Sequence, residues 1–259
     1  MTIPPTSSPE SSTPESSSPK SSTPASSAPE PRTPAPRTLE DFTSVFGTWT
    51  PQAVVFDCDG LLLDTESSWY RAQDVVVEEV AAQLTAEDDQ HLHGSTIETA
   101  ARIIAERSGS SEPHVLARLH EAFDKELSAG IEIMPGAAAL VEAVAAKVPV
   151  GCASNSWLEA LEGKLTTGGL REHFTVLEAS DTVENPKPAP DMYAAAAKEL
   201  GAAPEHTLAF EDSGTGARAA RDAGLRLIAV PAPGDAAPPA DLALTSLEDP
   251  GLLEWIATW

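Results

Sequence analysis

Residues that could do chemistry occur in four short clusters along the sequence. They are Asp57-Cys58-Asp59-Gly60, Ser154-Asn155-Ser156, Asn185-Pro186-Lys187-Pro188 and Glu211-Asp212-Ser213-Gly214. Carboxylates that face one another repel, and a divalent cation relieves the repulsion; a compact set of oxygen ligands suits Mg²⁺. Lys187 adds a fixed positive charge, and Ser154 adds a hydroxyl and backbone N–H groups at a predicted helix start, which favour an anion. A metal, a lysine and amides around one anion are typical of phosphoryl transfer.

The two aspartates of the first cluster allow covalent chemistry. One Asp can act as a nucleophile and form an aspartyl-phosphate, which splits the reaction into two easier steps. A second Asp two residues on can protonate the leaving oxygen and later activate water. Each cluster alone is a weak signal. Four clusters in order, each shortly after a predicted strand, are hard to attribute to chance.

Short apolar runs predict the strands that would position these clusters. The predicted strands are 53–56, 148–153, 175–177, 208–210, 227–230 and, more weakly, 242–244. Ala-rich helical stretches lie between them at 137–147, 158–166, 192–200 and 217–223. Strands that alternate with helices predict an α/β fold with a Rossmann-like parallel sheet covered on both faces. Ligands bind such sheets at the carboxyl ends of the strands, where the four clusters would meet.

Two segments depart from this alternation. Residues 67–133 contain no predicted strand, and apolar residues at helical spacing predict helices at 67–84, 96–108 and 113–129. We therefore expect an inserted all-helical cap at 67–133, with the α/β core formed by 49–66 and 134–259. Residues 1–48 begin with a stretch dominated by Ser, Thr and Pro, which has little to bury and predicts a disordered N-terminal tail.

Composition excludes several classes of protein. The formal net charge is −24, with 16 Lys and Arg against 40 Asp and Glu, which argues against binding to nucleic acid or to an anionic membrane. Two cysteines exclude a disulfide scaffold and fit a reducing compartment. No apolar run approaches the length of a membrane helix or of a signal peptide. These features predict a cytoplasmic protein and do not argue against a small phosphorylated metabolite, which the site chemistry favours as its partner; a monomer is favoured.

The motifs also carry a family resemblance, which covers roughly residues 50–235. VVFDCDGLLLDTE, Ser154, Lys187 in NPKPAPDMY and EDSGTGARAARDAG resemble the haloacid dehalogenase superfamily, and more closely its sugar-phosphatase and β-phosphoglucomutase-like branch with a small helical cap. The resemblance implies Asp57 as nucleophile and Asp59 as general acid/base, with the Asp59 backbone carbonyl also on the metal. It implies that Ser154 and Lys187 hold the phosphoryl group with Asn155 beside them. It further implies that Asp212 binds Mg²⁺, as does Glu211, directly or through water.

Other polar residues near the clusters have weaker claims. Glu66, where the chain leaves for the cap, and His93, in a short cap loop, are candidate substrate contacts; local turn bonding is an equal alternative for Glu66. Trp69 is expected to pack rather than bind. Cys58 and Cys152 are expected to point into the core as small buried apolar side chains.

Within the family, three residues guide the choice of reaction. Asp59 argues against the dehalogenase and phosphonatase branches. Trp69 stands where β-phosphoglucomutases have a His, and Ile97 stands near the place of their cap Arg, so both weaken the mutase alternative. We therefore expect a Mg²⁺-dependent phosphatase, a phosphoric monoester hydrolase acting on sugar or polyol phosphates. The alternatives are a β-phosphoglucomutase-like mutase and, in a different class, a non-catalytic binding module whose tail recruits partners.

Overall fold

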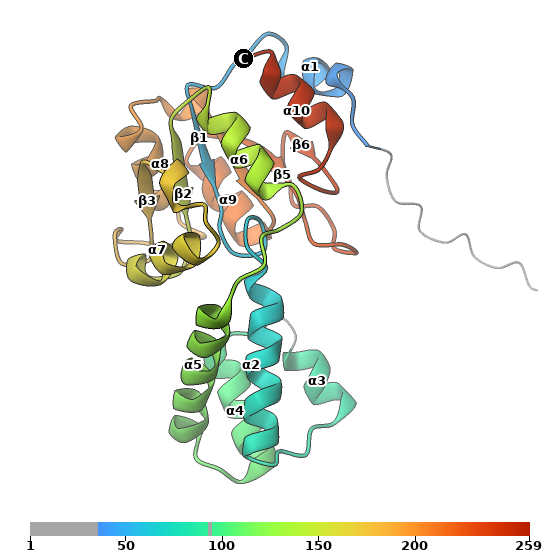
Figure 1. The fold of residues 1–259 in the computed structure, drawn as a ribbon, viewed down its shortest axis with the longest axis vertical. Coiled ribbons are helices and arrows are strands. Elements are labelled where there is room, and N and C mark those ends of the chain that lie inside the picture. Colours follow the sequence, from blue (N-terminus) through green and yellow to red (C-terminus); the bar gives the residue numbers. More distant parts are fainter. Residues whose placement is uncertain (1–35, 93–94) are drawn as a thin grey trace, which may run out of the picture. The chain divides into compact units, whose positions relative to one another are not determined.

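The fold is built around a parallel sheet of six strands. The structure is a computed structural model that describes residues 36–92 and 95–259. The strand order is β3-β2-β1-β4-β5-β6, and every pair is parallel (Figure 1). Each strand overlaps one of the predicted ranges: β1 (Ala53–Phe56), β2 (Val150–Ala153), β3 (Val176–Glu178), β4 (Thr207–Glu211), β5 (Arg226–Ala229) and β6 (Leu242–Ala243). The predicted Rossmann-like α/β core is confirmed.

Both faces of the sheet are covered by helices. Along β1, Val54 and Phe56 face one apolar cluster and Val55 faces another, because side chains alternate along a strand. The first cluster includes side chains of α6 (Ala137–Ala145), α7 (Leu158–Thr167) and α10 (Pro250–Ala257); the second includes those of α8 (Asp191–Glu199) and α9 (Gly214–Asp222). This double cover explains why all four residues of β1 are buried, and why the predicted strands read as continuous apolar runs.

The packed chain begins earlier than the sequence suggested. Helix α1 (Leu39–Phe46) lies inside the range 1–48 that was expected to be disordered tail. Its N-terminus is closed by a capping box in which Thr38 and Asp41 exchange hydrogen bonds. Phe42 and Phe46 are buried and stack on Trp255 of α10 at ring-centroid distances of 5.2 and 4.8 Å. The tail boundary at residue 48 was therefore too late, and α10 was not predicted; residues 1–35 lie outside the described part of the chain.

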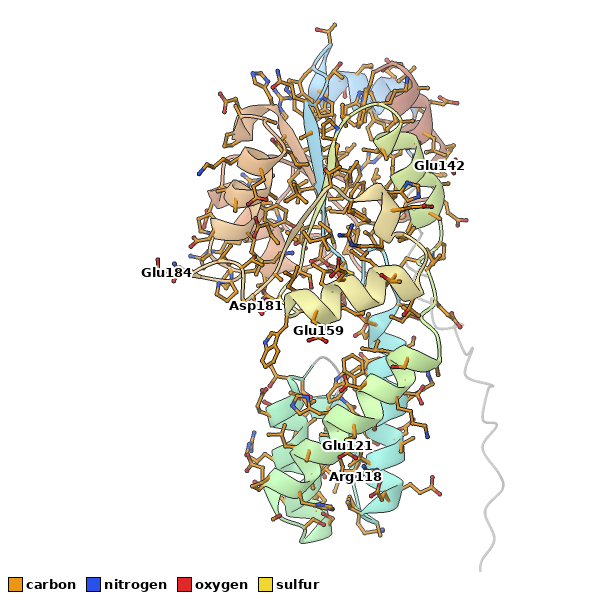
Figure 2. All side chains as sticks on the ribbon, turned by 60° about the vertical axis from the view of Figure 1, so that its left-hand side comes forward. Arg118, Glu121, Glu142, Glu159, Asp181 and Glu184 are labelled. Atoms are coloured by element: carbon orange, nitrogen blue, oxygen red, sulfur yellow. The ribbon has the colours of Figure 1, made fainter. Side chains whose placement is uncertain are left out.

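A separate group of helices follows β1. It consists of α2 (Thr65–Glu79), α3 (Ala86–Leu92), α4 (Ile97–Ser108) and α5 (Glu112–Ala129), and it buries an apolar cluster of its own around Ile104 and Leu119. On the surface of this group, Arg118 of α5 donates to Glu79 of α2 at 2.8 Å; Arg118 and Glu121 are labelled in Figure 2. The three predicted helices are present here, and α3 is an addition that its polar sequence AEDDQHL concealed.

The two chain segments that connect this helical group to the core run side by side. Leu63 and Ile133 form an isolated antiparallel bridge. The Asp64 N–H donates to the Glu132 carbonyl at 2.9 Å, and the Met134 N–H donates to the Leu62 carbonyl at 2.9 Å. The insertion thus leaves and rejoins the core at one place. Across residues 36–92 and 95–259, no helix is long and apolar enough to cross a bilayer.

Candidate active site

The four clusters meet where the sheet ends. Asp57 directly follows β1, Ser154 follows β2 and Asp212 follows β4, while Lys187 lies in the loop between β3 and α8. Because β1 lies between β2 and β4 in register, with Phe56 opposite both Cys152 and Phe210, these strand ends are adjacent. The Asp57 N–H extends the ladder by donating to the Phe210 carbonyl at 3.0 Å. The sheet thus places the predicted residues around one point.

Lys187 is the buried cation at this point. Its ammonium donates to Asp57 Oδ1 at 2.5 Å, to Glu211 Oε1 at 2.6 Å and to the Ala153 carbonyl at 2.9 Å. Tyr193, on the next helix, donates its hydroxyl to the same Glu211 oxygen at 2.6 Å. Burial acts to lower the pKa of Lys187, but the neighbouring Asp57 and Glu211 carboxylates outweigh it and raise that pKa, so the side chain is a permanent positive charge.

Asn155 holds the backbone of this lysine. Its side-chain Nδ2 donates to the Lys187 carbonyl at 3.1 Å, and its Oδ1 accepts from the Lys187 N–H at 3.0 Å. Asn155, which the resemblance places beside the phosphoryl group, lines a pocket together with Asp57 and Lys187. Its amide group, however, is engaged with Lys187 on both sides. The side chain thus fixes the loop that carries the lysine, and Asn155 can still offer an anion its backbone N–H and its second amide hydrogen.

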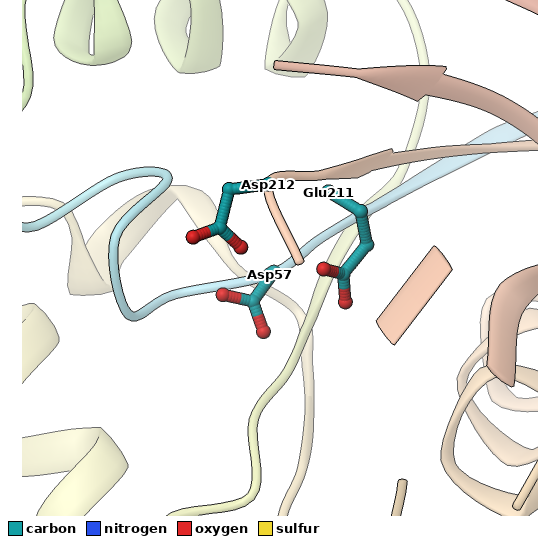
Figure 3. Close-up of side chains that lie close together, drawn as sticks. All are labelled: Asp57, Glu211 and Asp212. Atoms are coloured by element: carbon teal, nitrogen blue, oxygen red, sulfur yellow. The ribbon is translucent and has the colours of Figure 1, made fainter. Parts of the chain in front are cut away.

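Three carboxylates converge next to Lys187. Asp57, Glu211 and Asp212 each place an oxygen within 4.8 Å of the others, and Figure 3 shows their side chains pointing toward one another. Burial raises the pKa of Asp57 well above its usual range; Lys187 opposes this and the neighbouring carboxylates add to it. Burial and the charge of Glu211 raise the pKa of Asp212 to about 7. Crowded, buried carboxylates with raised pKa values fit a divalent cation that oxygen ligands prefer, such as Mg²⁺.

Two glycines make this arrangement possible. A Cβ at Gly216, in the first turn of α9, would lie 1.7 Å from Glu211 Oε1, so only glycine leaves room for the Glu211 carboxylate. Gly60 has φ +82°, and a Cβ there would lie 2.4 Å from Asp212 Oδ2. Glycine at this position therefore both adopts the left-handed turn and lets the chain after Asp59 pass close to Asp212.

Asp59 faces a different set of partners from Asp57. Its Oδ2 accepts from Ser154 Oγ at 2.7 Å and from Ser156 Oγ at 3.3 Å, and its Oδ1 accepts from the Lys164 ammonium. Burial works to raise the pKa of Asp59, but Lys164 and the hydroxyls hold it below its usual value. The Asp59 side chain is therefore not part of the carboxylate cluster; the predicted metal contact of Asp59 was through its backbone carbonyl.

Lys164 and Tyr193 were not among the residues predicted from the sequence. Lys164 lies within α7 with its side chain 6% exposed, a position where the sequence reads as an ordinary helix lysine. A signal was present, because Leu161 and Leu165 mark the same face of the helix as buried. The helix itself begins at an exposed loop where Asp181 accepts from the Leu158 N–H at 2.8 Å; Asp181 is labelled in Figure 2.

A pocket of about 630 Å³ opens beside Asp59. From the helical insertion it is lined by Thr65, Glu66, Trp69, Ser95, Thr96 and Phe123, and from the core by residues that include Asn155, Ser156, Lys164, Asp212 and Asp235. Glu66 is thus at the pocket, where it also accepts a hydrogen bond from Tyr70. Trp69 packs edge-on against Phe123 at 5.5 Å, as expected, and additionally forms pocket wall. His93 lies outside the described residues.

The two cysteines take no part in this chemistry. Cys58, between the two acids, and Cys152 at the end of β2 are both fully buried in the apolar core, and neither is in a disulfide. Hydrogen bonding with Cys152 and burial raise the pKa of the Cys58 thiol well above its usual range, so it stays protonated. Their predicted role as small buried side chains is confirmed.

Comparison with known proteins places this site in a family. The family model for haloacid dehalogenase-like hydrolases matches residues 54–230. The chain is 36% identical over 188 residues to YhcW of Bacillus subtilis, covering 70% of this chain and 83% of that protein. It is 33% identical over 182 residues to the fructose-1-phosphate phosphatase YqaB of Escherichia coli, covering 68% and 95%. A β-phosphoglucomutase-like structure from Thermotoga maritima has a TM-score of 0.72 at 26% identity, covering 80% and 98%.

The chain therefore belongs to the haloacid dehalogenase-like hydrolases. The resemblance noted in its motifs is confirmed, and so is the predicted enzyme class, a phosphoric monoester hydrolase.

Proposed function

We propose that the protein is a Mg²⁺-dependent phosphatase that hydrolyses small sugar or polyol phosphates through an aspartyl-phosphate intermediate. The observation that carries this proposal is the buried Lys187 ammonium, hydrogen-bonded to Asp57 and Glu211 at the carboxyl ends of the strands. A cation fixed beside an Asp oxygen can stabilise the negative charge on phosphoryl oxygens while that Asp attacks phosphorus.

Asp57 and Asp59 carry the two steps. In the first, an Asp57 oxygen bonds to phosphorus while the bond from phosphorus to the substrate alcohol breaks. The electron pair of the broken bond stays on the alcohol oxygen, which takes the proton of the Asp59 carboxyl and leaves as a neutral alcohol. Because Lys164 holds the pKa of Asp59 low in the free protein, Asp59 must gain this proton when the substrate binds. In the second, Asp59 takes a proton from water as the water oxygen bonds to phosphorus. The bond from phosphorus to Asp57 then breaks, which releases inorganic phosphate and restores both side chains.

The remaining groups hold the phosphoryl group and balance its charge. Lys187 and an N–H of Asn155 would bind phosphoryl oxygens, and the Ser154 hydroxyl would join them on releasing its hydrogen bond to Asp59. Asp57, Glu211 and Asp212, with the Asp59 carbonyl, would hold Mg²⁺; both Glu211 oxygens already accept from protein donors, which favours contact through water. When bound, the ion supplies positive charge that lets three carboxylates and a phosphate share one site.

The pocket walls support a neutral, hydroxylated leaving group. Ser95 lines the pocket with a buried hydroxyl that has no hydrogen-bond partner, so it can bind a substrate hydroxyl. Thr96 lies beside it, with its own hydroxyl bonded to Thr99. Glu66 and Asp235 add negative charge, which disfavours substrates with a carboxylate or a second phosphate. This charge is the specific argument against the mutase. Among the relatives are proteins named for fructose-1-phosphate, glycerol-3-phosphate and hexitol phosphatase activity.

We also propose that helices α2–α5 act as a cap on this site, with the boundaries at residues 67 and 133 given by the sequence. Closure over the substrate would exclude bulk water and bring the leaving group to Asp59. A cytoplasmic location, in a reducing compartment, fits the two buried free thiols.

The test is phosphate release from a panel of sugar, polyol and glycolate phosphates, with Mg²⁺ and with a chelator. Asp57→Asn is the inactive variant, because an amide cannot form the aspartyl-phosphate. Exposed Asp222 on α9 lies outside both pockets, and Asp222→Asn is the matched control. We expect Mg²⁺-dependent release with sugar or polyol phosphates that Asp57→Asn abolishes and Asp222→Asn retains.

Two other outcomes would contradict the proposal. The panel includes β-glucose 1-phosphate with a trace of β-glucose 1,6-bisphosphate; formation of glucose 6-phosphate without free phosphate would identify a mutase. No turnover of any compound by a folded protein would favour a binding module instead.

A further inference from the structure

We propose that Trp69 and Phe123 select substrates whose leaving group is a closed sugar ring over open-chain polyols of the same size. This inference rests on the proposed function and narrows its substrate class. The two side chains come from α2 and α5, helices that pack side by side (Figure 1). Their rings meet edge-on, with centroids 5.5 Å apart and an interplanar angle of 70°. Together they form an apolar part of the pocket wall.

The two aromatic rings lie where the leaving group, rather than the phosphate, is expected. The larger pocket, of about 630 Å³, is lined by Asp59 together with both rings. The smaller pocket is lined by Asp57 and Lys187 and by neither ring. In the proposed function the phosphoryl group is bound at Asp57 and Lys187, so the alcohol that leaves toward Asp59 occupies the larger pocket. The rings therefore belong to the surface that meets this alcohol.

The rest of the larger pocket is mainly polar. Apart from Gly60 and Ala232, the other residues that line it carry polar side chains. Glu66 and Asp235 can accept hydrogen bonds from substrate hydroxyls, and Ser95 has a buried hydroxyl without a partner. The pocket thus offers the leaving group one apolar contact together with several hydrogen-bonding groups.

A closed sugar ring matches this combination better than an open chain does. Its carbon-bound hydrogens gather on the faces of the ring and its hydroxyls project around the rim, so one face can be buried against Trp69 while the hydroxyls keep hydrogen bonds. An open-chain polyol carries a hydroxyl on every carbon, so contact with the aromatic rings leaves buried hydroxyls unpaired, which costs free energy. The open chain also loses rotations about its C–C bonds on binding, which the ring has already given up.

The alternative, which the sequence favoured for Trp69, is that both rings serve only to pack the helical insertion. Trp69 and Phe123 do pack against the apolar cluster around Ile104 and Leu119, although both side chains are only partly buried. If packing is their whole role, removal of Trp69 slows all substrates alike. If Trp69 contacts the leaving group, its removal changes the ratio between cyclic and open-chain substrates.

The test compares pairs of phosphates with the same carbon number, phosphate position and charge, one cyclic and one open. The pairs are glucose 6-phosphate with sorbitol 6-phosphate, mannose 6-phosphate with mannitol 6-phosphate, and ribose 5-phosphate with ribitol 5-phosphate. The leaving alcohol is primary in all of them, so the chemistry at phosphorus is the same and kcat/KM reports the contacts of the leaving group.

The variants are Trp69→Ala, Trp69→Phe, which keeps a smaller aromatic ring, and Phe123→Leu. Val75→Ala is the matched control, because Val75 lies in the same helix α2, is 46% exposed and lines neither pocket. Thermal midpoints are measured for every variant. A variant that is merely less stable shows a lower midpoint with an unchanged ratio within each pair.

We expect the wild-type protein to prefer the cyclic member of each pair that it turns over by about three- to tenfold in kcat/KM, the scale of one aromatic contact. Trp69→Ala should reduce this ratio to about one, Trp69→Phe should keep part of it, and Val75→Ala should keep all of it. No preference or an open-chain preference in the wild type, or a ratio that Trp69→Ala leaves unchanged, would overturn the inference while phosphatase activity stands. If Trp69→Ala does not fold, Trp69→Phe and Phe123→Leu give the same comparison. Lack of turnover of every compound would instead refute the proposed function.

Discussion

The two hydrogen bonds of Asn155 allow the effect of a substitution to be worked out in advance. Asn155→Ala removes the bonds to the Lys187 carbonyl and N–H, of 3.1 and 3.0 Å. Each is worth about 1 kcal/mol, and more where the partner is left buried without a bond, so we expect a loss of about 2–3 kcal/mol. If this whole loss raises the free energy of the transition state, because the Lys187 ammonium is no longer held in place, kcat/KM decreases about 30- to 150-fold.

The assay compares steady-state kinetics and inhibition by inorganic phosphate across two variants. Asn185→Ala is the matched control, because Asn185 is in the same loop and donates to Asp191 at 3.0 Å, away from the Lys187 ammonium. We expect Asn185→Ala to stay within about threefold of wild type, as surface substitutions usually do. If Asn155→Ala keeps kcat but weakens phosphate inhibition and raises KM, then its side chain contacts the phosphoryl group directly and the reasoning from its hydrogen bonds is refuted.

Two further outcomes follow from the carboxylate cluster. The pKa of Asp212 is raised to about 7. In the metal-free protein, Asp212 therefore contributes folding stability below about pH 4, and this contribution is lost as the pH rises through 7. Below pH 7, Mg²⁺ must displace a proton from Asp212 in order to bind. Titration calorimetry should show Mg²⁺ binding about 50-fold more tightly at pH 7 than at pH 5, and a pH-independent affinity would contradict this. Gly216→Ala should displace Glu211, lower the melting temperature and weaken Mg²⁺ binding at least about tenfold, the scale of lost support to a metal ligand. Gly163→Ala, in α7, is the control, because a Cβ added at Gly163 would have no atom within 4 Å; it should stabilise the protein by about 0.5–1 kcal/mol. Similar behaviour of the two variants would argue against a steric effect at Glu211.

Much of the site was predictable because it depends on strand ends. A short apolar run of four residues predicts a strand, and Asp57, which directly follows the run, is therefore expected at the carboxyl end of that strand. The same holds for Ser154 and for Asp212, and parallel strands bring these positions to one edge. Lys187 was predictable for a different reason: it is carried by a loop whose flanking prolines set it apart from an ordinary lysine.

The residues that sequence reasoning missed are those that reach the site from helices. Lys164 and Tyr193 lie within α7 and α8, where a helical pattern shows which face is buried but not which acid lies opposite. Asp59 and Lys164 are far apart in the sequence and meet only because the sheet fixes both. Helix α1 was missed although Thr38 and Asp41 form a recognisable capping box, because the Ser/Thr/Pro composition before it was extended too far along the chain.

The bridge between Leu63 and Ile133 has a consequence for the folding of the chain. Because residues 63 and 133 are already neighbours, the segment between them closes a long loop whose ends the core holds together. The entropy of closing such a loop grows only with the logarithm of its length, so the sheet hardly depends on how many residues the insertion contains. We expect a shortened chain, in which a few Gly and Ser residues replace 66–130, to form the same sheet. The insertion can then lengthen, shorten or be exchanged between proteins while the arrangement of Asp57, Lys187 and Asp212 is preserved.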